Sequence, residues 1–289
     1  MTSPKIPLIG LKASQFRHPL DQEATQALQQ LPGIDLAVRN LLGPVAEQVF
    51  YLNNIATSIR VSEQQLPHLH QLVVEASQIL DLEPPQLYIQ QNPVPNAYTL
   101  AIRGQQPFMV IHTSLIELLT TEEIQAVIAH ELGHLKCEHG VYLTLANLMV
   151  LASNLLPAWG AALAQTLQMQ LLEWLRCAEL SCDRAALLAI QDPKVVMSVL
   201  MKLSGGSPSL APLLNLDAFI AQARDYDQLS NTQLGEAIKS LQSQQLTHPF
   251  PVLRAREIDR WAHSPDYQDL LTREKGGYNT KATGKWRNW

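Results

Sequence analysis

The chain is poor in cysteine, and it lacks an N-terminal secretory signal. Three cysteines in 289 residues, Cys137, Cys177 and Cys182, are too few and odd in number for a disulfide framework, so we interpret them as small buried residues. The first twenty residues contain no apolar segment followed by a small-residue cleavage site. Both absences favour a reducing compartment, and we predict a cytoplasmic protein.

Long blocks of like charge are also missing, which excludes nucleic acid as an expected partner. The formal net charge is −5, and acidic and basic residues are interspersed along the chain. One uncharged segment, residues 141–163, is long enough to span a bilayer. Asn147, Pro157 and Gly160 interrupt it, so we favour two buried helices. Association with a membrane through residues 141–163 is the alternative.

The segment His130-Glu131-Leu132-Gly133-His134 carries the clearest chemical signal. Residues four apart on a helix lie one above the other, so His130 and His134 present two imidazoles toward one point. Two neutral imidazole nitrogens supply half of a tetrahedral zinc site, and Glu131 can act as general base toward a water there. The motif predicts one Zn²⁺ per chain and hydrolysis of an amide.

The flanking residues predict that this segment is helical. Thr120 and Glu123 have the spacing of a capping box, and apolar residues recur at helical intervals until Gly140 offers a stop. Gly133 inside a helix costs about 1 kcal/mol relative to Ala, which indicates close packing of another element there. The alternative is a chance match on a helix that happens to carry histidines.

A second candidate group lies on another predicted helix. Glu179 and Asp183 are again four residues apart, so both carboxylates face the same way. Glu179 is the candidate third zinc ligand, and Asp183 is the candidate acceptor for the free N–H of a ligating histidine. Without the histidine motif, both would be interpreted as a solvated helix face paired with Arg176 and Arg184.

Short β-rich runs at 87–89, 98–102 and 108–111 predict a small sheet, with residues 103–107 as the turn of a hairpin. An exposed strand edge beside a zinc site can bind an extended peptide as an added strand. Asn96, Ala97 and Tyr98 would then lie near the cleft. Taken alone, Asn96 is typical of a turn.

The rest of the chain suggests three parts. Residues 1–62 are a predicted helical extension, in which His18 and Asp21 are interpreted as capping or surface residues. Residues 63–262 form the predicted zinc domain. Residues 263–289, which are basic toward their end, are predicted to be a flexible tail.

Together these residues resemble the zinc metallopeptidases of family M48, which include HtpX, Oma and the Ste-type CAAX prenyl proteases. The resemblance covers roughly residues 66–261. It is carried by Asn96-Ala97-Tyr98, His130-Glu131-Leu132-Gly133-His134, Glu179 with Asp183, and Thr247-His248-Pro249 followed by Arg254.

The resemblance implies roles that composition alone does not assign. Asn96 is implied to contact the substrate backbone, His248 to stabilise the oxyanion, and Arg254 to be a supporting or charge contact. Many members carry transmembrane helices before and within the catalytic region, whereas we predict none before Ala129. Among such proteins, this chain resembles a soluble or peripherally attached member.

We therefore predict an α+β fold, a mainly helical, gluzincin-like zincin with a small sheet beside the motif helix. Zinc would be held by His130, His134 and Glu179, and the enzyme would cleave extended or unfolded protein segments, with protein quality control as one setting. The alternative is a zinc-stabilised, latent or non-catalytic binding module with an occluded cleft. An intact Glu131 argues against that alternative, because a structural site has no use for a base.

Overall fold

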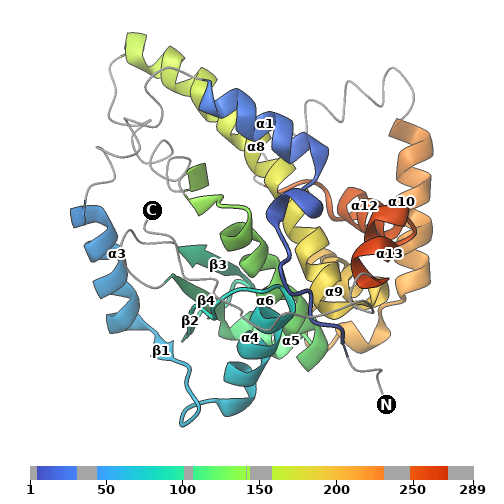
Figure 1. Cartoon of the computed structure of the whole chain (residues 1–289), viewed down its shortest axis with the longest axis horizontal. Coiled ribbons are helices and arrows are strands. Elements are labelled where there is room, and N and C mark those ends of the chain that lie inside the picture. The colour runs from blue at the N-terminus through green and yellow to red at the C-terminus, as the bar shows by residue number, and fades with distance from the viewer. Residues whose placement is uncertain are drawn as a thin grey trace.

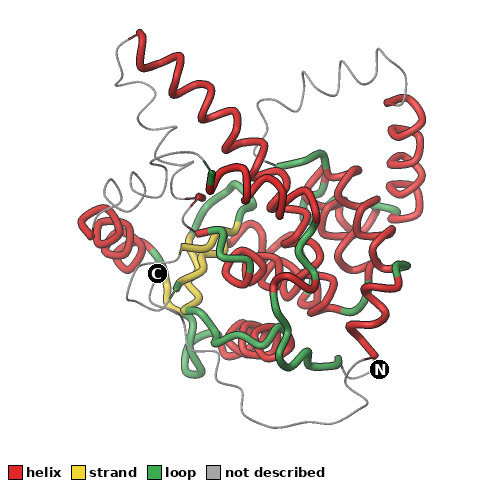
Figure 2. Tube along the Cα trace, turned by 45° about the horizontal axis from the view of Figure 1, so that its top comes forward, coloured by secondary structure: helices red, strands yellow, loops and turns green. Residues whose placement is uncertain are grey.

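The computed structural model describes residues 5–30, 44–100, 107–140, 142–143, 158–230 and 248–272. The described chain is mainly helical, with one small sheet at the side of the helical body (Figures 1 and 2), which confirms the predicted α+β class. The helices are α1 (Pro19–Gln29), α3 (Pro44–Thr57), α4 (Pro67–Ile79), α5 (Thr113–Leu118), α6 (Thr121–Lys136), α8 (Ala158–Ile190), α9 (Pro193–Gly205), α10 (Leu216–Ser230), α12 (Pro251–Ala262) and α13 (Pro265–Thr272).

Several expectations fall on residues that lie outside this description. They are the body of the hairpin turn at 103–106, most of the uncharged segment 141–163, and the tail from 273. Within the described residues, no helix is both long enough and apolar enough to cross a membrane.

The sheet has four described strands in the order β1 (Ile59–Arg60), β2 (Gln86–Gln90), β4 (Phe108–His112) and β3 (Ala97–Leu100). The pair β2 and β4 is parallel, and the other two pairs are antiparallel. β4 is buried throughout, as its continuous apolar sequence requires, and β3 lies at one edge of the described sheet next to α6. An edge strand therefore stands beside the motif helix.

Helix α6 begins where the sequence predicts and ends slightly earlier. The capping box is present, because the Glu123 amide donates to the Thr120 hydroxyl at 3.4 Å and the Thr120 amide to the Glu123 carboxylate at 2.8 Å. At its end, the His139 amide bonds the His134 carbonyl, and Glu138 adopts a left-handed φ of 59°. This hydrogen bond and the left-handed residue before it are the features of a Schellman motif. The motif ends the helix at Lys136 rather than at Gly140.

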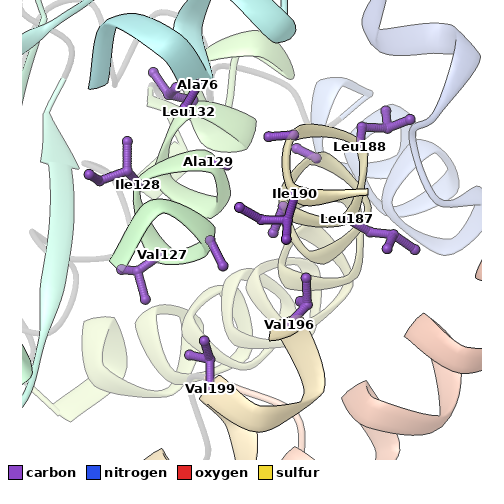
Figure 3. Close-up of a cluster of buried hydrophobic side chains, with 14 of the residues drawn as sticks. Ala76, Val127, Ile128, Ala129, Leu132, Leu187, Leu188, Ile190, Val196 and Val199 are labelled. Atoms are coloured by element: carbon purple, nitrogen blue, oxygen red, sulfur yellow. The ribbon is translucent and has the colours of Figure 1, made fainter. Parts of the chain in front are cut away.

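Helices α6 and α8 pack very closely, and Gly133 is the point of closest approach. A Cβ atom at Gly133 would come within 2.9 Å of both the Ala185 Cβ and the Cys182 Cα. Around this point α6, α8, α9 and α4 bury a common apolar core (Figure 3), which includes Ile128 and Leu187. The close packing expected at this glycine is therefore present, and the packed element is α8.

The N-terminal segment is bound to this core instead of forming a separate layer. Leu8, Leu11 and Phe16 belong to the main apolar cluster, and the Gln191 side chain bonds both the amide and the carbonyl of Ile6. Helix α1 then lies along α8 (Figure 1). The interpretation of Asp21 as a capping or surface residue was wrong, because its side chain is completely buried.

The first residues of the predicted tail form a helix. Residues 265–272 form α13, in which Tyr267 and Leu270 are buried and the Tyr267 ring packs on Trp261. The division of the chain at residues 62 and 262 stays a prediction.

The contact at Gly133 predicts that Gly133→Ala changes the stability in the opposite direction to the change expected from helix propensity. Propensity alone would make Gly133→Ala stabilising by about 1 kcal/mol, whereas the overlap with α8 should make it destabilising by about 1–3 kcal/mol. Equilibrium urea unfolding measures the difference. The matched control is Gly205→Ala in the last turn of α9, where a Cβ meets nothing within 4 Å. A stabilised Gly133→Ala protein would contradict the packing.

Candidate metal and catalytic site

Two helices bring the three predicted ligands together. His130 and His134 project from α6, and Glu179 projects from α8 between them. The Nε2 atom of His130 lies 3.2 Å from Glu179 Oε2, and the Nε2 atom of His134 lies 3.3 Å from Glu179 Oε1. All three side chains are mostly or wholly buried.

These three groups fit a tetrahedral metal ion. Ligand atoms about 2.0–2.1 Å from a tetrahedral zinc lie about 3.3 Å from one another, and each histidine Nε2 lies near this distance from one oxygen of Glu179. Glu179 Oε2 is buried and lacks a well-directed hydrogen bond in the described residues, although nitrogen atoms lie near it. Two imidazole nitrogens and one carboxylate oxygen are also a donor set that zinc prefers.

Asp183 and Arg254 support the first histidine. The Nδ1 atom of His130 lies 3.1 Å from Asp183 Oδ1, on the side away from Glu179. Arg254, from α12, binds Asp183 through two hydrogen bonds of 2.8 and 2.7 Å. This bidentate pair fixes the Asp183 carboxylate, so that it accepts the Nδ1–H of His130 and leaves Nε2, on the Glu179 side, as the nitrogen that can bind a metal.

The electrostatics of the cluster follow from burial and pairing. Burial disfavours charge on His130, but Glu179 and Asp183 outweigh it and raise the pKa of His130 to about 10. Burial would also raise the pKa of Glu179, yet His248 and His130 hold it well below its usual range. Without a cation at the site, the proton on His130 partly balances the two buried carboxylates.

Glu131 lies between the histidines and faces a cavity. Its Oε2 atom accepts a hydrogen bond of 2.9 Å from the Thr99 hydroxyl, which belongs to the edge strand β3. The cavity has a volume of about 490 Å³, and it is lined by His130, Glu131 and Glu179 together with residues of β3, α9 and the start of α12. A base with a fixed orientation therefore stands next to a space that can hold a substrate.

The structure places most of the residues singled out from the family resemblance at the cavity and one of them on the other face of the sheet. Asn96 and Ala97 line the cavity, as does His248, whose Nε2 lies 3.5 Å from Glu179 Oε2 and whose side chain is 56% exposed. The Tyr98 ring instead packs against His112 and the small cluster on the other face of the sheet. Side chains alternate along β3, so Tyr98 faces away from Ala97.

Three residues near the site were not expected from the sequence. Thr99 binds the candidate base, His139 binds His134, and Asp21 binds His139. The sequence contains one indication for Asp21, because Asp21 shares a helix face with Thr25 and Leu28, and that face is buried. It contains none for Thr99 and His139, since their roles depend on strand register and on the turn after α6.

Cys182 also lies near the two histidines of the motif. Its Sγ atom is close enough to His130 and His134 to complete a ligand set. Burial, together with nearby acidic groups, raises the pKa of Cys182 well above the ordinary value, and burial likewise raises the pKa of Cys177 to about 11. In the metal-free protein both side chains are therefore thiols.

This arrangement defines a class of protein. A histidine pair with an intervening glutamate on one helix, completed by a glutamate from a second helix, is the site of a gluzincin-type metallopeptidase. The sequence profile described as Peptidase family M48 matches residues 63–262. The chain belongs to this family, which confirms the resemblance.

Relatives agree with this assignment. The plastoglobule-localized metallopeptidase 48 of Arabidopsis thaliana, a chloroplastic protein, is 59% identical over 91% of this chain and 76% of its own length. An HtpX protease homologue from Moorella thermoacetica is 28% identical over 65% of this chain and 70% of its own length. No solved structure matches the chain. The protein is thus a peptidase of a metal-dependent family that acts on proteins or peptides, and the non-catalytic alternative is not favoured.

The buried ion pair predicts a large cost for removing one partner. Replacing Arg254 by Leu leaves Asp183 buried without its cation, which should lower the free energy of unfolding by about 3–5 kcal/mol. The control is Arg260→Gln on the same helix, because Arg260 is 67% exposed in its pair with Glu257 and should contribute at most about 1 kcal/mol. Urea unfolding of both variants measures the contrast, and equal small losses would contradict the supporting role of Arg254.

Proposed function

We propose that the chain is a zinc metalloendopeptidase that cleaves extended or unfolded protein segments. The observation that supports this most is that His130 and His134 place their Nε2 atoms 3.2 and 3.3 Å from the Glu179 carboxylate, close to the separation of two ligands on tetrahedral zinc. The three residues would hold one Zn²⁺ per chain. Bound there, the ion supplies a Lewis acid that polarises the scissile carbonyl and makes a water more acidic.

Glu131 is the proposed general base and acid. Its carboxylate lines the cavity, so it can take a proton from the attacking water and later give that proton to the leaving amine. The hydrogen bond from Thr99 to Oε2 holds the carboxylate in one orientation and leaves the other oxygen for the water. His248, at the cavity wall, is the proposed donor to the oxyanion.

The edge strand β3 is the proposed substrate-binding strand. It pairs with β4 on one side only among the described strands, and Asn96 and Ala97 at its start line the cavity. A peptide that adds to this edge would be held through its backbone, which tolerates many sequences and requires an extended chain. Tyr98 would support the strand from the opposite face.

One wall of the cavity favours an apolar substrate side chain next to the cleaved bond. Leu115, Val127, Val196, Val199 and Leu200 form this wall, and none of them carries charge. A charged side chain placed there would lose its hydration without gaining a partner. We therefore propose a preference for medium or large apolar residues.

The proposed location is a reducing compartment, with the cytoplasm as the first expectation. The Arabidopsis relative is named for localisation to plastoglobules, and association with a membrane through residues 141–163 is the alternative to test. Cell fractionation followed by flotation on a density gradient separates the two. Recovery with floating lipid would replace the cytoplasmic proposal.

The role of Glu131 predicts that Glu131→Gln keeps the metal and loses turnover. Removing a general base lowers rates by about 10²–10⁴-fold, whereas the ligands are unchanged. Casein cleavage and metal content should be measured on the same sample, with Glu122→Gln, an exposed change in the same helix, as the control. Turnover near that of the control would disprove the assignment of the base.

The apolar wall predicts that Val199→Phe changes the substrate preference. The larger ring should fill part of the cavity, so kcat/KM for peptides with Leu or Phe at the adjacent position should fall by about 10-fold or more relative to Ala. A matched peptide series measures the ratio, with Leu213→Phe, at a side chain 80% exposed, as the control. An unchanged ratio would place the substrate elsewhere.

A further inference from the structure

His139 lies directly behind the second histidine of the motif. Its Nδ1 atom is 3.1 Å from the Nδ1 atom of His134, and its Nε2 atom is 3.1 Å from Asp21 Oδ2. His139 and Asp21 are both completely inaccessible to solvent. A continuous row of hydrogen bonds thus connects helix α1 to the side of His134 that faces away from Glu179.

The direction of these hydrogen bonds follows from Asp21. Its carboxylate accepts from Arg17 at 2.8 Å, from Ser181 at 2.6 Å and from Thr25 at 3.0 Å, so it remains ionised and has no proton to donate. His139 therefore donates its Nε2–H to Asp21, and in the neutral imidazole its Nδ1 is then the acceptor.

The acceptor on His139 sets the tautomer of His134. His134 donates its Nδ1–H to His139 Nδ1, which leaves the lone pair of His134 Nε2 directed at Glu179. Asp183 does the same for His130 by a direct contact. The Nδ1 atom of each histidine of the motif is therefore held by a hydrogen bond. The partner is a carboxylate for His130 and a second imidazole for His134.

The backbone also holds His139 in place. The Schellman motif at the end of α6 directs the chain back, with a hydrogen bond from the His139 amide to the His134 carbonyl. Glu138 occupies the left-handed position of this motif without being a glycine, which costs about 1 kcal/mol. The His139 ring is further packed edge-on against Trp174 of α8.

A second metal ion is a weaker explanation of the same residues. Ligand atoms of Asp21, Cys137 and His139 lie within 4.8 Å of one another. The Arg17 guanidinium, however, already contacts the Asp21 carboxylate and the Cys137 carbonyl, at 2.8 and 2.7 Å. A cation is therefore present in the form of an arginine, and a metal ion would be repelled by it.

We propose that His139 and Asp21 are positioning residues for the metal ligand His134. Helix α1, which precedes the residues matched by the family profile, is then part of the metal site. The proposal rests on the proposed function, because it requires that His134 binds the metal. It predicts that the N-terminal segment controls metal affinity without touching either metal or substrate.

The test is the Zn²⁺ affinity of the full-length chain, measured by competition with a chromogenic chelator. His139→Phe retains a buried ring beside Trp174 but offers no acceptor, and it should bind Zn²⁺ about 10–100-fold more weakly, as for other residues that orient metal ligands. His139→Asn, whose amide oxygen occupies the place of Nδ1 and can accept from His134, should recover most of the affinity. Leu28→Ala, a buried change on α1 outside this row, should leave the affinity unchanged.

Loading with Co²⁺ gives a second readout that a general loss of stability does not change. His139→Phe should alter the visible absorption of bound Co²⁺, whereas Leu28→Ala should reproduce the wild-type spectrum. If His139→Phe does not fold by circular dichroism, the isosteric Asp21→Asn takes its place, with a loss of about 10-fold expected.

Wild-type Zn²⁺ affinity together with a wild-type Co²⁺ spectrum in the variant that folds would overturn this inference alone. A wild-type chain that binds no Zn²⁺ would overturn the proposed function as well.

Discussion

The close contact between α6 and α8 at Gly133 is the constraint on which the site depends. Only a residue without a Cβ lets the two helices approach until His130 and His134 lie within 3.3 Å of Glu179. One helix thereby supplies two imidazoles and the base, and the other supplies the facing carboxylates. The apolar core around this contact gives the rigidity that a metal site needs, since ligands must be held within a few tenths of an ångström.

Because the two helices pack so closely, several carboxylates are buried, and residues from other parts of the structure neutralise their charge. Asp183 is paired with Arg254 from α12, and Asp21 is paired with Arg17 beside α1. Glu179 keeps one buried oxygen without a well-directed hydrogen bond among the described residues, and a divalent cation held by the histidines would balance it. Residues beside α1 and on α12 thus support the proposed ligands on α6 and α8.

Local patterns predicted well the helix that carries the motif. The capping box of Thr120 and Glu123 located the start of α6, and Gly133 indicated that another element packs closely there, because both signals are local to this helix. What the sequence could not predict depends on distant contacts. Thr99 reaches Glu131 through strand register, Asp21 reaches His139 across the fold, and Tyr98 turns away from the cavity by the alternation of its strand. The helix α13 was missed because its few apolar residues lie in a segment of mostly polar composition.

The most direct test of the account is a metal and activity measurement on the full-length chain. Metal content should be determined on the purified protein, and casein cleavage should be followed before chelation, after chelation and after addition of Zn²⁺. The account predicts one zinc per chain, loss of cleavage on removal of the metal, and recovery when zinc is restored. Cleavage that continues in metal-free protein would contradict the assignment of His130, His134 and Glu179 as the ligands of a catalytic zinc.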